Sequence, residues 1–331
     1  MLSPSQKRLA RARTAGWLLA GPLPIPGICD LIKKYSNELY GVVIAKFTDQ
    51  NRAVTALAML PDGLLASGST TGEVSVWDAA SGECMLTLEG HTKSVTALAT
   101  LPDGRLASGS LDGTVRVCDV YGPNAGTCVL TLTHHTDSVT ALAMLPDGLL
   151  ASGSWDGTVR VCDVRGPNAG ACLFTLSDHA RTITALAVLP DGKLASGSLD
   201  HTVRVWDVNT GACLLTLAGH PREVNVMAVL SNGLLASGTL DRTIHVWDTA
   251  TGVCLRTLNV IGGRLTCLIS LRDGRLASGS IDGAIRVFEA TQGARELTLR
   301  GNMDAGVTAL IRLPNGMFAS GSGNGDMCVW R

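Results

Sequence analysis

The sequence predicts an all-β protein in which seven copies of one four-stranded antiparallel sheet form a β-propeller. The first observation is a repeat, because the run Ala-Ser-Gly recurs at intervals of 41, 44, 44, 41, 41 and 42 residues. The second is that each copy divides into short apolar stretches separated by turn residues, which is typical of strands. The third is the composition, with 38 glycines and only 4% aromatic residues. The seven copies of the run begin at Ala66, Ala107, Ala151, Ala195, Ala236, Ala277 and Ala319.

Each copy can be followed strand by strand. A first apolar strand, such as residues 54–60, leads into a Pro-Asp-Gly turn, whose residues tolerate the positive φ that a hairpin needs. The Leu-Ala-Ser-Gly-Ser run is the second strand, and an Asp-Gly corner (Asp112 and Gly113) precedes a third strand at 114–117. A polar loop then leads to a fourth strand, residues 128–132. Two copies, residues 94–132 and 138–176, agree at 32 of 39 positions, so the duplication is plain.

The chain resembles the WD-repeat (β-transducin-like) family in motifs that recur along about 290 residues. Trp-Asp ends the third strand at Trp77, Trp206 and Trp247, and Gly-His precedes the first strand at His91 and His220. The resemblance implies a seven-bladed ring around a central channel, spanning residues 42–331. In this family an N-terminal strand typically completes the last blade. We therefore expect residues 42–47 to pair with the final copy, which ends after its third strand.

Serine, histidine and aspartate recur together in four copies, a grouping that a hydrolase also uses. Four equivalent copies do not suit a nucleophile, which needs one site with an oxyanion hole. The family resemblance implies a structural role instead: a hydrogen-bonded chain from Asp to His to Ser to Trp. We expect no enzyme and no cofactor or metal. The network residues are His91, Ser108, Asp112, His135, Ser152, Asp156, His179, Ser196, Asp200, Trp206, His220, Ser237, Asp241 and Trp247.

Candidate partner-binding residues lie at the loop tips, where function usually resides in this family. We expect protein or peptide partners, and no small-molecule substrate, on a surface from Trp155 towards Arg264. Exposed apolar residues with one aromatic favour binding, whereas cover by neighbouring loops is the alternative. Insertions at 122–124 and 166–168 suggest a second surface on the opposite face. The candidates are Leu111, Trp155, Leu199, Leu240, Ile281, Thr182, Arg222, Glu223, Asn225 and Arg264, and a nearly uniform ring of threonines lies next to them.

Cysteines and arginines also follow the repeat. Five of the ten cysteines occupy one repeated position, and neither a Cys-x-x-Cys pair nor zinc-ligand spacing occurs. We predict reduced, buried core residues in the cytoplasm or nucleus, with redox or metal chemistry as the alternative. Repeated arginines on the third strand suggest either a phosphate-binding stripe or, as we favour, stems that cover a neighbouring blade with the guanidinium on an acidic group. The five cysteines are Cys84, Cys128, Cys172, Cys213 and Cys254, and the arginines are Arg116, Arg160, Arg204 and Arg286.

The first 41 residues differ in kind, with six basic and two acidic residues. Residues 1–20 resemble an organellar targeting peptide weakly, and a basic tail is the alternative. Residues 28–39 have the apolar spacing of an amphipathic helix. Leu23-Pro24 ahead of that helix resembles the start of an F-box, so the alternative function is a ubiquitin-ligase adaptor acting through residues 22–41. The net charge of −1 and the lack of a long apolar run predict neither specific nucleic-acid binding nor a membrane span.

Overall fold

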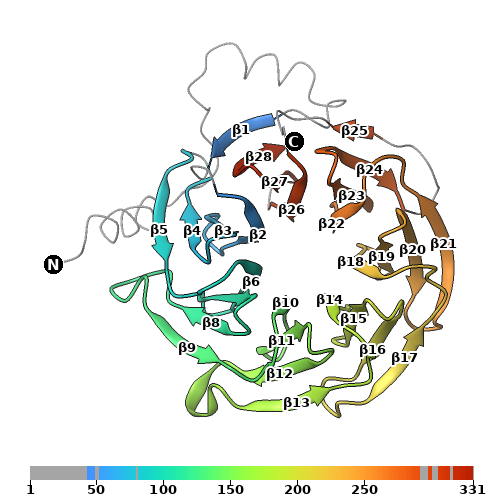
Figure 1. The fold of residues 1–331 in the computed structure, drawn as a ribbon, viewed down its shortest axis with the longest axis horizontal. Coiled ribbons are helices and arrows are strands. Elements are labelled where there is room, and N and C mark those ends of the chain that lie inside the picture. The colour runs from blue at the N-terminus through green and yellow to red at the C-terminus, as the bar shows by residue number, and fades with distance from the viewer. Residues whose placement is uncertain are drawn as a thin grey trace.

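The computed structural model describes residues 43–48, 52–79, 81–290, 297–299, 305–313 and 316–330. These residues form seven four-stranded antiparallel sheets arranged around a central axis (Figure 1). The predicted all-β, seven-bladed propeller is therefore confirmed. The targeting-like residues 1–20, the F-box-like segment 22–41 and the predicted helix 28–39 lie outside the described residues.

Each blade runs outwards from its first strand to its fourth, and blades one to six use four consecutive strands each. The innermost strands are β2 (Val54–Met59), β6 (Val95–Thr100), β10 (Val139–Met144), β14 (Ile183–Val188), β18 (Val224–Val229), β22 (Leu265–Ser270) and β26 (Val307–Arg312). The second strands are β3 (Leu65–Ser69), β7 (Leu106–Ser110), β11 (Leu149–Ser154), β15 (Leu194–Ser198), β19 (Leu235–Thr239), β23 (Arg275–Ser280) and β27 (Phe318–Ser322).

The outer half of each blade carries the edge of its sheet. The third strands are β4 (Val74–Trp77), β8 (Val115–Cys118), β12 (Val159–Asp163), β16 (Val203–Trp206), β20 (Thr243–Asp248), β24 (Ile285–Glu289) and β28 (Asp326–Trp330). The outer strands are β5 (Cys84–Leu88), β9 (Cys128–Leu132), β13 (Cys172–Leu176), β17 (Cys213–Leu217), β21 (Val253–Asn259), β25 (Leu297–Leu299) and β1 (Val43–Thr48). One 3-10 turn, η1 (Gly166–Asn168), lies in the inserted loop of blade three.

The Pro-Asp-Gly turns join the first and second strands as their residue types predict. In blade two, Leu101 and Arg105 pair across the turn, with 2.8 Å from Leu101 N to Arg105 O. Gly104 adopts a φ of 88°, which glycine reaches without a steric cost. The Asp103 carboxylate accepts the Arg105 backbone N–H at 3.1 Å, so the side chain at the turn also stabilises it.

The hydrophobic core lies between the blades. Seven clusters of buried side chains each combine residues from two neighbouring sheets. Trp206 of blade four, for example, packs with Val159 and Leu176 of blade three. The cluster that includes Trp77 joins blade one to blade seven and completes the circle. Since burial of apolar surface is the main stabilising term, each blade depends on both of its neighbours.

Two repeated residues form a seam where the innermost strands meet. The glycine of each Ala-Ser-Gly run leaves room for the next blade, since a Cβ on Gly153 would lie 2.5 Å from Ile183 Cγ2. The neighbouring Thr140 donates its hydroxyl to the carbonyl oxygens of Gly153, at 3.0 Å, and Ile183, at 2.5 Å. Equivalent bonds cross all seven interfaces, from Thr55 to Val95, Thr96 to Val139, Thr140 to Ile183, Thr184 to Val224, Asn225 to Leu265, Thr266 to Val307 and Thr308 to Val54.

Ring closure joins the two ends of the described chain. Strand β1 pairs antiparallel with β28, so blade seven has the sheet order β1-β28-β27-β26 (Figure 1). Lys46 Nζ lies 2.9 Å from a carboxylate oxygen of Asp326, and the Thr48 hydroxyl donates to the same carboxylate at 2.9 Å. Pairing in this way satisfies backbone groups of β28 that an open edge would leave exposed.

The cysteine prediction was wrong in part. Cys118 and Cys128 form a disulfide between the third and outer strands of blade two. Cys84 and Cys254 are exposed, and Cys172 and Cys213 are only partly buried. The repeated cysteine begins the edge strand, where a side chain can face solvent, which is why a core position was the wrong expectation. Cys162 and Cys328 are buried, as a small apolar residue would be.

Candidate partner-binding face

The loop face of the propeller carries, in each blade, the corner between the second and third strands and the loop that enters the first strand. The corner residue donates its backbone N–H to a carbonyl of that entry loop, which brings the two predicted rings of candidates side by side. The bonds measure 2.9–3.2 Å and join Thr70 to Ala53, Leu111 to Ser94, Trp155 to Ser138, Leu199 to Thr182, Leu240 to Glu223, Ile281 to Arg264 and Gly323 to Gly306.

The candidates differ in exposure. Trp155 is 52% exposed and Ile281 is 56% exposed, which is unusual for such large apolar side chains. Leu111, Leu199 and Leu240 are half-buried, so neighbouring loops cover part of each side chain. The exposed apolar surface of these corner residues is therefore concentrated in blades three and six.

Asn225 belongs to the seam between blades five and six. Its side-chain nitrogen donates to the Leu265 carbonyl at 2.8 Å, in the place where the other blades use threonine. This bond fixes the Asn225 side chain across the contact between the two blades, while its second N–H and its amide oxygen have further hydrogen-bonding capacity. The residues at the equivalent positions, such as Thr184, make the same kind of bond, at 2.8 Å to Val224. This ring holds the blades together.

A basic arc, defined as Arg181, His201, Arg222, Arg242 and Arg264, runs along the loop face of blades four to six. All four arginines are exposed. His201 and Arg242 occupy the corner position that is glycine in the other blades, and they keep its left-handed backbone, with φ of 71° and 73°. Side chains are therefore present at two corners where the other blades have none. Sequence reasoning missed both, although the replacement of glycine in the Asp-Gly corner was a visible signal.

Contacts between neighbouring blades connect the corners to the entry loops that carry the arc. His201 Nε2 lies 4.0 Å from the carboxylate of Glu223 in the next entry loop, and Arg242 donates to the Gly262 carbonyl of the following one at 3.2 Å. The corner of blade three likewise meets the blade-four loop, where a Cβ on Gly157 would lie 3.4 Å from the Arg181 carbonyl. The arc thus begins beside Trp155 and ends beside Ile281.

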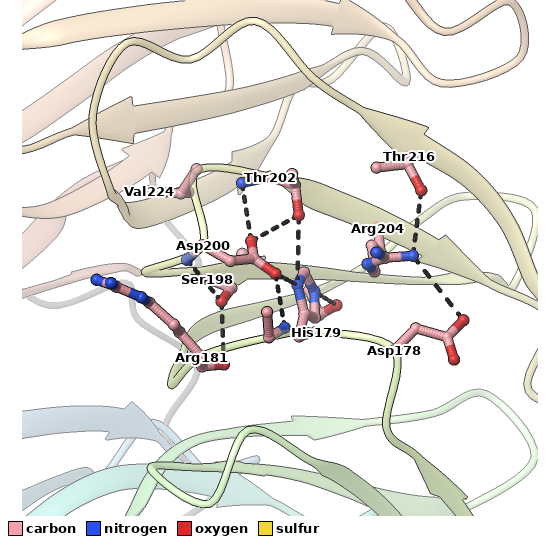
Figure 2. A network of polar contacts seen from close by, with 12 residues as sticks. Asp178, His179, Arg181, Ser198, Asp200, Thr202, Arg204, Thr216 and Val224 are labelled. Carbon is pink, nitrogen blue, oxygen red and sulfur yellow. Dashed lines mark hydrogen bonds and ion pairs between the residues drawn. The ribbon is translucent and has the colours of Figure 1, made fainter.

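Beneath this face, the predicted Asp-His-Ser groups form hydrogen-bonded chains. In blade four, His179 Nδ1 lies 2.7 Å from the Asp200 carboxylate (Figure 2). Its Nε2 lies 2.8 Å from Ser196 Oγ, which also accepts the Trp206 indole N–H at 2.7 Å. Thr202 adds a bond to the same carboxylate. Because Asp200 accepts, the histidine proton belongs on Nδ1, and Nε2 accepts the serine hydroxyl. Blades two and three form the same Asp-His-Ser bonds at 2.8–2.9 Å, through His91 and His135.

Burial and these bonds shift the titration of the network. Burial lowers the pKa of His179, against the opposing effect of Asp200, so the imidazole is neutral near pH 7. The pKa of Asp200 falls to about 2 although burial acts to raise it, because Thr202, His179 and the Ala180 backbone donate to its carboxylate. Ser196 is completely buried. In this structure the Ser196 hydroxyl is thus closed off from solvent and is held by His179 and Trp206.

Blade five departs from the predicted network. His220 Nε2 meets Ser237 Oγ at 2.7 Å, and Trp247 donates to the same oxygen, but His220 Nδ1 has no hydrogen-bond partner. Asp241 instead accepts bonds from Thr239 and Thr243. The second histidine, His245, replaces the arginine of other blades and lies with its ring centroid 4.7 Å from that of His220. Burial first and the neighbouring His245 second lower the pKa of His220 to about 4.

Blade six compensates for its missing histidine with an arginine. Arg286 is buried and donates to Ser280 Oγ and to the Asp282 carboxylate, both at 2.7 Å. Arg204 has a weaker acidic contact, 3.9 Å from Asp178 (Figure 2), and Arg160 donates to Thr175 at 3.2 Å. The expected contact between guanidinium and carboxylate is therefore present for Arg204 and Arg286. It does not extend to Arg160, whose observed partner is a hydroxyl.

The part of the chain that the structure describes shows neither a metal-binding cluster nor a membrane-spanning helix. In that part of the chain, no group of three or more His, Cys, Asp or Glu side chains is placed to hold a metal ion. No helix in the same residues has the length and apolar character needed to cross a membrane. The loop face thus remains the strongest candidate site.

Comparison with known protein families shows a family whose repeat the chain matches. The model described as "WD domain, G-beta repeat" matches residues 41–78, 82–119, 126–163, 170–207 and 211–248, together more than half of the chain. Each matched unit contains the outer strand of one blade and the first three strands of the next, so the units interlock around the ring. No curated protein matches the chain.

Proposed function

Because the chain belongs to the WD40 repeat family, whose propellers typically serve as protein-interaction scaffolds, we propose that it is a non-catalytic scaffold that binds a protein segment on its loop face. The bound segment would extend from Trp155 along the basic arc towards Ile281. The proposal fits a surface in which the polar groups below the loops are already committed to structural bonds.

The observation that carries this proposal is the exposure of Trp155 next to the arc. A half-exposed tryptophan can bury a large apolar area against a partner at a small conformational cost. It stands on a corner held by backbone bonds, as in Trp155 N to Ser138 O at 2.9 Å, and a rigid anchor loses little entropy on binding.

The arc favours a partner with acidic side chains. Four exposed arginines from three successive blades lie on one face, whereas Glu223 is the acidic residue of the entry loops that contacts the arc. Arginine guanidinium groups recognise carboxylates through paired hydrogen bonds. The N-terminal extension is a poor occupant by charge, since it carries six basic and two acidic residues.

Affinity purification of the full chain with mass spectrometry tests the proposal. Trp155→Ala should reduce partner recovery at least tenfold, because an aromatic hot-spot residue is worth about 2 kcal/mol or more. Leu173→Ala is the matched control, since Leu173 is 49% exposed in the same blade but lies on the outer strand. Unchanged recovery with a folded Trp155→Ala protein would exclude the proposed face.

Two further variants separate the finer alternatives. Arg222→Glu combined with Arg264→Glu should weaken recovery and its dependence on salt if the partner is acidic. The adaptor alternative predicts that ubiquitin-ligase subunits are recovered with the full chain and lost when residues 22–41 are removed. Retention of all partners in the charge-reversal variant would leave the scaffold proposal standing but exclude an acidic partner.

A further inference from the structure

The repeated cysteine lies opposite one fixed position of the third strand in five blades. In three of these blades that position is the family tryptophan, and the partners are Trp77–Cys84, Trp206–Cys213 and Trp247–Cys254. Blades two and three have cysteine in place of tryptophan. Their partners are therefore the thiol pairs Cys118–Cys128 and Cys162–Cys172.

The two thiol pairs share their local geometry. Both pairs are separated by ten residues, and both lie at a register shift between the third and outer strands. Cys118 and Cys128 are joined by a disulfide, whereas Cys162 and Cys172 are free thiols. Cys172 is partly exposed and donates its thiol to the Phe174 carbonyl at 3.4 Å. An arrangement that accommodates a disulfide in blade two is thus repeated in reduced form in blade three.

We propose that Cys162 and Cys172 are a site of reversible covalent modification that forms a second cross-strand disulfide with a low-molecular-weight disulfide, such as glutathione disulfide, as the oxidant. The thiolate of Cys172 attacks one sulfur of the oxidant, forming a mixed disulfide and releasing one thiolate. Cys162 then loses its proton and attacks the Cys172 sulfur, which releases the second thiolate. The protein loses two electrons and two protons, and the oxidant becomes two thiols.

Exposure sets the order of these steps. Cys172 is the accessible thiol, while Cys162 is 1% exposed and serves as the resolving thiol. Burial, followed by the neighbouring Cys172, raises the pKa of the Cys162 thiol to about 12. A reductant that attacks the accessible Cys172 sulfur would have to expel Cys162, and a thiol of high pKa is a poor leaving group. The pair should therefore form slowly and be reduced slowly.

The modification would restrict the conformational freedom of the enlarged loop of blade three. The disulfide would join β12 to the edge strand β13 across residues 163–171, which include the inserted turn η1. The disulfide of blade two already closes the equivalent loop across residues 119–127. After oxidation, a disulfide would thus link the two ends of each inserted loop on the face opposite the arc.

Peptide mass spectrometry tests the proposal on the full-length protein. The protein is reduced, equilibrated in glutathione buffers of increasing oxidised fraction, quenched in acid and alkylated. Trypsin cleaves after Arg160, Arg165 and Arg181, so a Cys162–Cys172 disulfide links two separate peptides, 161–165 and 166–181. We expect this linked pair to accumulate as the oxidised fraction rises and to disappear in Cys162→Ser.

Cys213 is the control within the same protein, because it occupies the same repeated position as Cys172 but lies opposite Trp206 instead of a cysteine. Cys213 should remain alkylatable or carry glutathione alone, and Cys213→Ser should leave the linked pair unchanged. The proposal is overturned if Cys162 and Cys172 both stay alkylated, or if Cys172 carries glutathione alone, in samples where Cys118 and Cys128 are oxidised. Because no binding partner enters this experiment, its result is independent of the proposed scaffold function.

Discussion

The seam between blades can be tested by adding one methyl group, through Gly153→Ala at the contact between blades three and four. Gly153 lies in the second strand β11 and faces Ile183, the first residue of β14. Its φ is not in the left-handed region, so alanine meets no backbone strain there. In an ordinary strand, alanine in place of glycine would stabilise the fold by about 0.5–1 kcal/mol.

Steric overlap reverses that expectation. The added Cβ would lie 2.5 Å from Ile183 Cγ2 and 3.0 Å from Ile183 Cβ, well inside the roughly 3.5–4.0 Å of a normal carbon contact. Ile183 is completely buried and β-branched, so it cannot turn away cheaply. Overpacking of a core typically costs about 1–3 kcal/mol. We therefore expect Gly153→Ala to lower the free energy of unfolding by about 1–2 kcal/mol after the backbone gain is subtracted.

Urea unfolding monitored by circular dichroism measures this effect. Gly323→Ala is the matched control, since its Cβ would meet only ordinary contacts at 3.7 Å and 3.9 Å, and its stability should change by less than about 0.5 kcal/mol. In the double mutant with Ile183→Ala, the loss should be smaller than the sum of the two single losses, because the shortened side chain relieves the overlap. A Gly153→Ala protein as stable as the wild type would refute this account of the seam.

Three further predictions concern the network, the closure and the arc. Burial lowers the pKa of His220 to about 4, so its contribution to stability should be complete above pH 6.5 and lost as the pH falls towards 4. In His220→Asn, the free energy of unfolding measured by urea titration should therefore depend less on pH between 6.5 and 4 than in the wild type. Lys46→Ala removes the ion pair with Asp326 and should reduce stability by about 1 kcal/mol, less in high salt, as urea titrations at two ionic strengths would measure. Arg242→Gly should leave the melting temperature unchanged or raised while reducing partner recovery; a lower melting temperature would contradict the strain assigned to this corner.

The fold was predictable from the sequence because every local signal agrees with the repeat. Turn residues, strand lengths and the small residues of the seam recur at the same place in each copy. A correct secondary-structure assignment for one copy therefore applies to all seven. The position of the candidate residues on a common face follows from the same register. What the repeat did not predict is the use of individual side chains, as with Asn225, whose amide completes the seam and is committed to Leu265.

The structure differs from the prediction where side chains from two different positions of the repeat contact each other. The pairing of Cys118 with Cys128 depends on the register shift between β8 and β9. The sequence does not reveal this shift when each repeated position is considered separately. Blade five contains the four expected network residues, but His245 lies against His220, whose Nδ1 lacks a partner. Blade six lacks the histidine, and Arg286 supplies equivalent bonds from another strand. Such exchanges depend on side-chain reach in three dimensions, which spacing alone does not specify.

The distribution of backbone strain also favours the arc as the functional surface. The seam is nearly identical in all seven blades, so it cannot orient an asymmetric partner. Asymmetry enters at the corners, where His201 and Arg242 retain the left-handed conformation that glycine adopts at the equivalent corners, such as Gly157 and Gly283. A non-glycine residue in that region costs about 1–2 kcal/mol. Strain of this kind is commonly found at functional sites, and here it falls in the two adjacent blades that present the centre of the arc.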